Sequence, residues 1–455
     1  MTTLHAKNAL LPTGWASNVT LTLSDGRIEK IIDGPEITNG PAETSVDILL
    51  PAPSNLHSHA FQRAMAGLTE RRGADKTDSF WTWRQLMFRF LDQLTPDDIQ
   101  AITAQVQMEM LEAGYAASVE FHYLHHRPGG SRYDDVGELA ARIGAAAEQT
   151  GIGLTLLPVL YQQGGVDGRP LGPGQIRFGN DIDGYMQLMD AAQQIVTDLP
   201  DDAQLGIAPH SLRAVTPDAL KHVQQFQGPI HMHLAEQIAE VDEIKAAYGA
   251  RPVTWALDHL DIDARWCLIH CTQMTTVETR GLAGTGAVAG LCPLTEGSLG
   301  DGIFKGSDWT EAHGRWGIGS DSNILISLTQ ELRALEYSQR LITHNRAVMA
   351  TSEKSTGRVL FEGACQGSAQ AAGRQSGTIE VGMWADLVAL NGDAIDFIGR
   401  QGDRILDTWI FAGTDAQVRD VWAAGRHVVK DGHHIARPAI TDAYRSTMMR
   451  LRDVM

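Results

Sequence analysis

The chain has 455 residues, a formal net charge of −18 and 43% hydrophobic residues, a composition typical of a globular protein with one large domain and one smaller one. The acidic balance argues against nucleic acid or an anionic membrane surface as a partner. No apolar stretch reaches the ~20 residues that cross a bilayer, and no secretory signal is evident at the N-terminus. The four cysteines show no Cys-x-x-Cys spacing, so we expect reduced, buried thiols in a cytoplasmic protein.

Short β-strands are predicted near both ends of the chain, where alternating apolar residues are bounded by turn residues. The strand-like segments are Val19–Leu23 and Ile28–Ile32 near the N-terminus, and Ala385–Leu390 and Val421–Val429 near the C-terminus. We therefore expect a small β-sandwich domain built from both termini. Its two parts are residues 1–48 and residues 377–455, and the second part also holds a terminal helix.

Between these ends, strands are predicted to alternate with helices. Thr95 as N-cap and Pro96 in the first turn mark the start of one such helix. The eight strand-like runs are residues 48–50, 118–123, 154–161, 205–210, 230–234, 266–270, 287–292 and 316–321. Alternation of this length predicts an α/β fold with a closed (β/α)₈ TIM-like barrel over residues 49–376.

Four of these runs lead into side chains that bind metals or carry protons. His57 and His59 follow the first run, and because side chains alternate along a strand they point the same way. The other three runs carry, in chain order, His231, His233 and Glu236, then His270, then Asp321. The carboxyl ends of barrel strands form the active-site face, so this pattern predicts a metal centre. Spacing alone leaves either His231 or His233 as the ligand.

These residues, in this order, resemble the amidohydrolase superfamily, which implies a distorted (β/α)₈ barrel with metal ligands on strands one, five, six and eight. The segment from His233 to Glu236 is similar to the His-x-x-Glu signature of one-metal deaminases, and no candidate for a bridging carboxylated lysine is found. Within the superfamily the chain resembles the formimidoylglutamate deiminases of bacterial histidine degradation. The matching segments are residues 55–68, 79–84, 120–123, 210–217, 299–304 and 319–322.

The resemblance implies one divalent metal ion per chain, expected to be zinc. The implied ligands are His57, His59, His233 and Asp321. Asp321 would also accept a proton from the attacking water, His270 would orient that water, and Glu236 would deliver a proton to the leaving nitrogen. A bound zinc ion lowers the pKa of its water from ~16 towards ~7, which supplies the nucleophile. His231 is interpreted as a supporting residue rather than a ligand.

The implied reaction converts N-formimino-L-glutamate into N-formyl-L-glutamate and ammonia. Arg84 and Arg213 would each bind a carboxylate of this small anionic substrate through paired hydrogen bonds. Gln62, Tyr123 and His210 would fix its orientation. We also expect a homodimer.

The sequence departs from the family pattern at two positions. Asn323 stands where a histidine is expected and Ser298 where an asparagine is expected. Both are predicted to flank the pocket, so they bear on substrate affinity.

Two other functions stay open on the sequence. One is deamination of an aromatic ring such as guanine or adenosine, which the two arginines disfavour because a neutral ring needs no cation. The other is a non-catalytic scaffold, which the intact ligand set disfavours. Trp81 and Trp83 are interpreted as packing residues rather than as a cofactor-stacking pair. His122, His125 and His126 are interpreted as a solvated polar loop rather than a second metal site, and a surface role for Arg84 remains an alternative.

Overall fold

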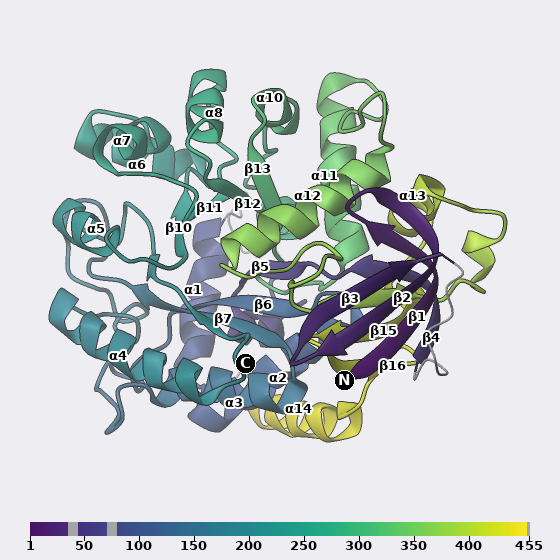
Figure 1. Ribbon diagram of the computed structural model, residues 1–455. Helices are drawn as coiled ribbons and strands as arrows, with labels where there is room; N and C mark the ends of the chain where they lie inside the picture. The colour runs from purple at the N-terminus through teal and green to yellow at the C-terminus, as the bar shows by residue number, and fades with distance from the viewer. Residues whose placement is uncertain (35–43, 71–79, 453–455) are drawn as a thin grey trace.

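The computed structural model describes residues 1–34, 44–70 and 80–452, with the backbone alone at residues 80–82. Two structural units build the molecule (Figure 1). One is a sheet formed by strands from both ends of the chain, and the other is a ring of parallel strands with helices around it. The confirmed fold class is therefore a (β/α)₈ barrel with a small β domain built from both termini.

The terminal sheet has eight strands in the order β17-β16-β15-β14-β4-β1-β2-β3. They are β1 (Thr2–Leu11), β2 (Gly14–Ser24), β3 (Arg27–Asp33), β4 (Thr44–Pro51), β14 (Leu387–Leu390), β15 (Val418–Ala423), β16 (Arg426–Lys430) and β17 (His433–His434). Only β1 and β4 pair in parallel. The two ends of the chain meet where β14 pairs antiparallel with β4. This unit has its own apolar core, in which Leu21 and Val46 from one end pack with Leu387 and Trp422 from the other.

The barrel consists of two arcs of parallel strands. The first arc holds β5 (Ser54–Ser58), β6 (Ala117–His122), β7 (Gly153–Leu160), β8 (Gln204–Leu205) and β9 (Ala208–Pro209), and the second holds β10 (Ile230–Leu234), β11 (Trp266–His270), β12 (Val288–Leu291) and β13 (Arg315–Ile318). Isolated parallel bridges join the arcs at both ends. One bridge pairs Ser58 with Asp321 at one joint, and two bridges at the other joint pair Ile207 with Ile230 and Ser211 with His233.

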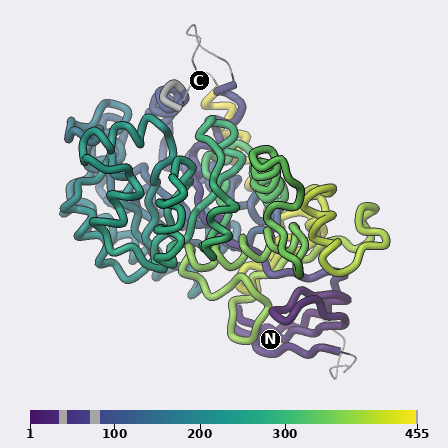
Figure 2. Tube along the Cα trace, turned by 90° about the horizontal axis from the view of Figure 1, so that it is seen from above, coloured from purple at the N-terminus to yellow at the C-terminus, as the bar shows by residue number. Residues whose placement is uncertain are grey.

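Helices follow the barrel strands and cover the outside of the ring (Figures 1 and 2). They are α1 (Phe80–Leu91), α2 (Pro96–Glu112), α3 (Glu138–Thr150), α4 (Ile182–Asp198), α5 (Pro217–Val223), α6 (Ile238–Tyr248), α7 (Pro252–His259), α8 (Thr276–Ala283), α9 (Pro293–Leu299), α10 (Gly306–Glu311), α11 (Leu328–Thr343), α12 (Thr356–Ala371), α13 (Asp403–Phe411) and α14 (Arg437–Leu451), with short 3₁₀ helices η1 (Ala60–Met65), η2 (Ile395–Phe397) and η3 (Asp415–Gln417). Thr95 caps α2 through a reciprocal capping box with Asp98, as its sequence predicts. Among the described helices, none is long and apolar enough to cross a membrane.

Three predicted strands differ from those observed. The run at residues 48–50 belongs to β4 of the terminal sheet, and the strand that carries His57 is β5, which begins after Pro51 and Pro53. Prolines lack the N–H that a strand ladder needs, so the pairing stops and restarts there. The run at residues 421–429 is a hairpin of β15 and β16, and the run at residues 205–210 is divided between β8 and β9.

A buried cluster of ion pairs connects the terminal sheet to the barrel. Arg374 donates to Asp202 and Asp386 at 2.7 and 2.6 Å, and Arg426 donates to Asp202 at 2.7 Å. Asp386 also accepts the backbone N–H of Ala424 at 2.7 Å. Because the carboxylates are paired on several sides, their burial is compensated. The terminal helix α14 packs on barrel helix α2, as Figure 1 shows at the lower edge of the molecule.

Candidate active site

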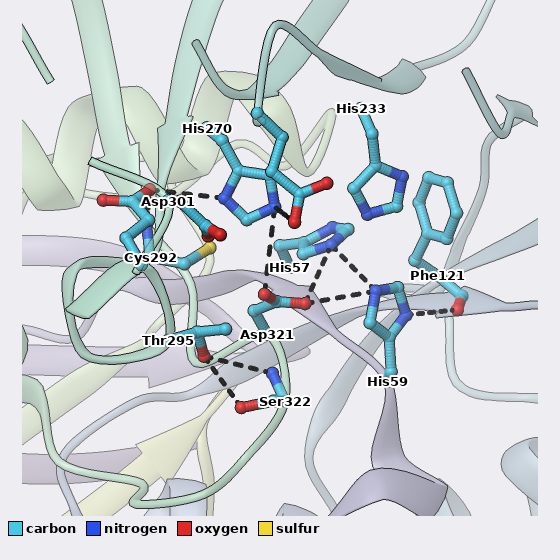
Figure 3. A network of polar contacts seen from close by, with 12 residues as sticks. His57, His59, Phe121, His233, His270, Cys292, Thr295, Asp301, Asp321 and Ser322 are labelled. Atoms are coloured by element: carbon cyan, nitrogen blue, oxygen red, sulfur yellow. Dashed lines mark hydrogen bonds and ion pairs between the residues drawn. The ribbon is translucent and has the colours of Figure 1, made fainter. Parts of the chain in front are cut away.

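Four side chains converge at the carboxyl ends of the barrel strands (Figure 3). They are His57 in β5, His59 directly after it, His233 in β10, and Asp321 after β13. One potential ligand atom from each lies within 4.8 Å of all the others. Asp321 Oδ1 is 3.4 Å from His57 Nε2 and 3.1 Å from His59 Nε2. The structure therefore brings together all four residues that were predicted as ligands.

In two of these histidines, the hydrogen bonds to neighbouring carbonyls use Nδ1, so Nε2 remains available to bind a metal. His59 Nδ1 lies 3.0 Å from the carbonyl of Phe121, and His233 Nδ1 lies 3.1 Å from the carbonyl of His210. A carbonyl only accepts, so each Nδ1 carries the hydrogen and each Nε2 lone pair faces the cluster. Burial lowers the pKa of His57 to about 3, which keeps this imidazole neutral.

The donor chemistry of the cluster fits a divalent ion. Burial also holds the pKa of His233 well below its usual range. Burial would raise the pKa of Asp321, but the close approach of His57 and His59 outweighs it and lowers that pKa. Neutral imidazoles with an ionised carboxylate form a set that suits a borderline metal such as zinc.

His231 lies outside this cluster. Its side chain is fully buried, and its Nε2 is 2.8 Å from the carbonyl of Ala371 at the end of α12. Burial lowers its pKa to about 4, so it forms a neutral hydrogen bond between strand and helix. The structure thus separates two histidines that spacing alone left equivalent.

Three acidic side chains lie close to His270, the last residue of β11. Its Nε2 is 3.8 Å from Glu236 Oε1 and 3.8 Å from Asp321 Oδ2. Its other ring nitrogen is 3.3 Å from Oε1 of Glu296, which also accepts the backbone N–H of Cys292 at 2.8 Å. Sequence reasoning missed Glu296, although it follows a strand end by only a few residues. Burial raises the pKa of Glu236, which favours a carboxyl group that can carry a proton.

The backbone is left-handed where several of these side chains emerge. The φ angles are +53° at Ala235, +69° at His270 and +46° at Asp321, a region that costs free energy for residues other than glycine. Glu240 in α6 supports the first of these bends. Its carboxylate accepts the backbone N–H groups of Ala235 and Glu236 at 3.1 and 3.0 Å, and therefore fixes the loop that presents Glu236.

A buried amide and hydroxyl network joins the first and last barrel strands behind the cluster. Asn55 donates to Ser320 Oγ at 2.7 Å, and Ser320 donates to Asn323 Oδ1 at 2.6 Å. Asn323 in turn donates to Ser58 Oγ at 3.2 Å. Asn323 is thus fully buried in this network, and Ser298 is exposed on α9. Neither side chain lines the pocket itself, and their effect on substrate affinity stays a prediction.

All five predicted substrate-binding residues line one pocket over the cluster. They are Gln62, Arg84, Tyr123, His210 and Arg213, and they share it with His59, His233, Glu236, His270 and Asp321. Arg84 is half-buried there, so the alternative of a surface arginine is wrong. Residues that the sequence reasoning did not assign to substrate also line the pocket, namely Trp83, Met87, Phe88, Tyr161, Phe178 and Leu299. Ser79 and the side chain of Trp81 lie outside the described residues.

The two arginines occupy different parts of this pocket. Arg213 Nη2 lies 4.0 Å from Glu236 Oε2. Arg84 donates from Nη2 to the hydroxyl of Tyr161 at 2.9 Å. Burial lowers the pKa of Arg84, and the charge of Arg213 lowers it further. Two cations therefore face one cavity of a protein whose formal charge is −18.

The histidines after β6 are not solvated. His122, His125 and His126 are all buried. His125 Nε2 lies 3.0 Å from the carbonyl of Val159, and His126 Nε2 lies 2.7 Å from the carbonyl of Gly179. The prediction of a solvated polar loop is wrong, because the chain folds back over β7 and supplies backbone partners. The four cysteines are free and buried, as predicted.

Two family models match the chain. The one described as "Amidohydrolase family" matches residues 48–428, and the one described as "Formimidoylglutamate deiminase HutF, N-terminal domain" matches residues 1–42. The formimidoylglutamate deiminase of Pseudomonas aeruginosa is 45% identical, and the alignment covers 100% of both chains.

Two solved structures are similar to the whole chain. The crystal structure of an amidohydrolase from Brucella melitensis has a TM-score of 0.94 and 45% identity, and covers 99% of this chain and 100% of that one. An adenosine deaminase from Xanthomonas campestris with bound zinc has a TM-score of 0.82 at 20% identity, and covers 99% and 98%. The second likeness concerns the fold alone.

Proposed function

We propose, on the premise that this chain belongs to the amidohydrolase family and within it to the formimidoylglutamate deiminases, that it hydrolyses N-formimino-L-glutamate to N-formyl-L-glutamate and ammonia. The observation that supports this substrate most directly is the pair Arg84 and Arg213 in one pocket with the histidine–aspartate cluster. The substrate carries two carboxylates, and two guanidinium groups match them in charge and number.

The metal that this family uses would be held by His57, His59, His233 and Asp321. We propose one ion per chain and expect zinc, because imidazole nitrogen and carboxylate oxygen are its common ligands. When bound, the ion supplies a water of lowered pKa that is nucleophilic at neutral pH.

The proton steps are assigned to three residues of this chain. Asp321 is ionised and accepts the proton of the attacking water. His270, 3.8 Å from Asp321 and held by Glu296 on its other side, orients that water. Glu236, whose pKa is raised by burial, delivers a proton to the departing nitrogen, so ammonia leaves as a neutral molecule.

The position of the arginines orients the substrate. The α-carboxylate lies on the carbon that bears the retained nitrogen, next to the formimino group, so it belongs near Glu236, where Arg213 lies. The side-chain carboxylate is two methylene groups farther away and belongs with Arg84. Gln62, Tyr123 and His210 line the wall between these ends and offer neutral polar groups to the substrate.

Ammonia release tests this proposal. Purified protein is assayed with N-formimino-L-glutamate, N-formimino-L-aspartate and guanine, and its metal content is measured by elemental analysis. We expect about one divalent ion per chain and turnover of the glutamate derivative above all. Turnover of guanine without activity on either dicarboxylate would favour an aromatic-ring deaminase, and full activity of a metal-free preparation would contradict the mechanism.

Several broader predictions accompany the proposal. A homodimer, a cytoplasmic location and the lack of nucleic-acid or membrane partners remain predictions. The division into residues 1–48, 49–376 and 377–455 is likewise proposed. Sedimentation of the purified protein tests the first, and limited proteolysis tests the division.

A further inference from the structure

Tyr161 lies at the mouth of a barrel strand and has no role in the proposed reaction so far. It directly follows β7, is buried, and lines the pocket. Its ring packs edge-on against His210 with centroids 4.6 Å apart, and lies 5.6 Å from the ring of Phe178. The side chain is therefore held in one place on the wall that faces the substrate.

Two donors bind the Tyr161 hydroxyl, and the direction of both bonds is fixed. Arg84 donates from Nη2 at 2.9 Å, and a guanidinium has no acceptor. Gln175 donates from Nε2, also at 2.9 Å. The amide of Gln175 is oriented because its Oε1 accepts the backbone N–H of Gly172 at 2.9 Å, which leaves only the NH₂ group for Tyr161.

The hydrogen of the Tyr161 hydroxyl must consequently point elsewhere. A phenol has one O–H and can accept about two hydrogen bonds, and Arg84 and Gln175 occupy both acceptor positions. Within residues 1–34, 44–70 and 80–452, no group accepts this hydrogen. The remaining direction available beside Arg84 is the pocket, where a carboxylate oxygen is the expected partner.

We infer that Tyr161 is a specificity-determining residue, whose hydroxyl donates a hydrogen bond to the substrate carboxylate bound by Arg84, and that Gln175 sets the direction of this donor. The inference rests on the proposed function. The side-chain carboxylate would then accept hydrogen bonds from two donors, the charged Arg84 and the neutral Tyr161, which are already hydrogen-bonded to each other. A hydroxyl locked in the donor orientation favours an anion over an amide NH₂ at this position.

The test compares two substrates with wild type and Tyr161→Phe. The substrates are N-formimino-L-glutamate and N-formimino-L-glutamine, which carries a neutral amide in place of the side-chain carboxylate. We expect Tyr161→Phe to lower kcat/KM for the glutamate derivative by about 10- to 100-fold, mainly through KM, because a hydrogen bond to a charged group is lost. For the glutamine derivative we expect a smaller change of about 3-fold, since its amide oxygen can accept the hydrogen bond but carries no charge.

Two further variants make the result decisive. Tyr185→Phe is the matched control, because the Tyr185 hydroxyl donates to the carbonyl of Pro158 in β7 at 2.8 Å and does not line the pocket. Tyr185→Phe should leave kcat/KM unchanged for both substrates. Gln175→Met keeps Tyr161 but frees its hydroxyl to rotate, so we expect a smaller loss, again larger for the glutamate derivative. If Tyr161→Phe does not fold, the question is decided by comparing the loss of kcat/KM in Gln175→Met on the glutamate derivative with its loss on the glutamine derivative.

The outcomes separate this inference from the proposed function. If wild type fails to turn over N-formimino-L-glutamate, the proposed function is wrong and this inference falls with it. If wild type is active but Tyr161→Phe loses activity equally on both substrates, or on neither, the proposed function stands and the Tyr161 donor is overturned.

Discussion

The two ends of the pocket are built differently. At the metal end, His57, His233 and His270 come from the barrel strands themselves and are held by backbone carbonyls or buried carboxylates. At the carboxylate end, Gln62 lies on η1 and Arg84 on α1, which are segments between strands. The chemistry therefore depends on the ring, whose geometry is fixed by strand pairing. In the proposed reaction, substrate choice would depend on the connecting segments, which can change without disturbing the proposed ligands.

The largest effect is expected at the metal end, from Glu236→Gln. Glutamine preserves the shape of the side chain but cannot deliver a proton, so kcat should fall by about 10²–10⁴-fold. The metal content should stay at the wild-type value, because Glu236 is not a ligand. Asp242→Asn, an exposed change on α6, the helix that follows Glu236, is the control. Near wild-type turnover of Glu236→Gln would show that another group carries the proton.

Arg213 is proposed to bind a substrate carboxylate, so Arg213→Ala should lower kcat/KM for N-formimino-L-glutamate and leave metal binding intact. Leaving a substrate carboxylate unpaired in a buried pocket costs on the order of 2–5 kcal/mol in kcat/KM. The measurement is steady-state kinetics on N-formimino-L-glutamate together with elemental analysis. Arg445→Ala, on the exposed face of α14, should change neither quantity. An unchanged kcat/KM for Arg213→Ala would show that this arginine does not bind a substrate carboxylate.

Glu240→Ala sharpens the comparison, because it alters the metal end without removing any group that touches substrate. The two N–H bonds that hold the bend at Ala235 and Glu236 would be lost. We expect kcat to fall by about 10-fold with little change in KM, since each lost bond costs roughly 1 kcal/mol. The pH profile of kcat, compared with wild type, checks whether Glu236 has become misplaced. A loss confined to KM would instead assign Glu240 to substrate binding.

The smallest effect on turnover is expected far from both ends, at Asp202. Burial would raise the pKa of Asp202, but Arg426 and Arg374 outweigh it and lower that pKa. Asp202→Asn should therefore leave kcat unchanged but destabilise the fold by about 3 kcal/mol at pH 7.

The pH dependence of this stabilisation has a definite sign. A lowered pKa means that the contribution is fully present above the unfolded value of ~4 and is lost as pH falls through the folded value. Urea unfolding of wild type and variant should show the difference shrinking below about pH 4. Asp201→Asn, at the exposed neighbouring position, is the control. A difference that persists at low pH would mean that the charge of Asp202 is not what stabilises the interface.

The metal end could be predicted from residue patterns and the carboxylate end could not. Alternating side chains and repeated strand ends identified His57, His59 and Asp321 without a structure. Arg84 gave no such signal, because a helix between strands has no fixed relation to the strand ends, and it was found only through family resemblance. Tyr161 did follow the strand-end pattern, but it was interpreted as part of the strand.

Other contributions depend on contacts that no local pattern encodes. Glu296 and Glu240 act through backbone N–H groups on neighbouring loops, and these loops become neighbours only when the barrel closes. The choice of His233 over His231 likewise depends on Ala371, which is distant in the chain. The start of β5 was misplaced because the apolar run before it pairs with β14, a partner from the other end of the sequence.

The left-handed backbone at Ala235, His270 and Asp321 limits how this site can be transplanted. Copying its side chains onto the regular strand ends of another barrel would aim them along the wrong vectors, because here the bend as well as the residue sets the direction. An engineer would have to move the bends together with the carboxylate and amide groups that stabilise them. By the same reasoning, glycine at these three positions would relieve backbone strain, but at His270 and Asp321 it would also remove side chains that form the site.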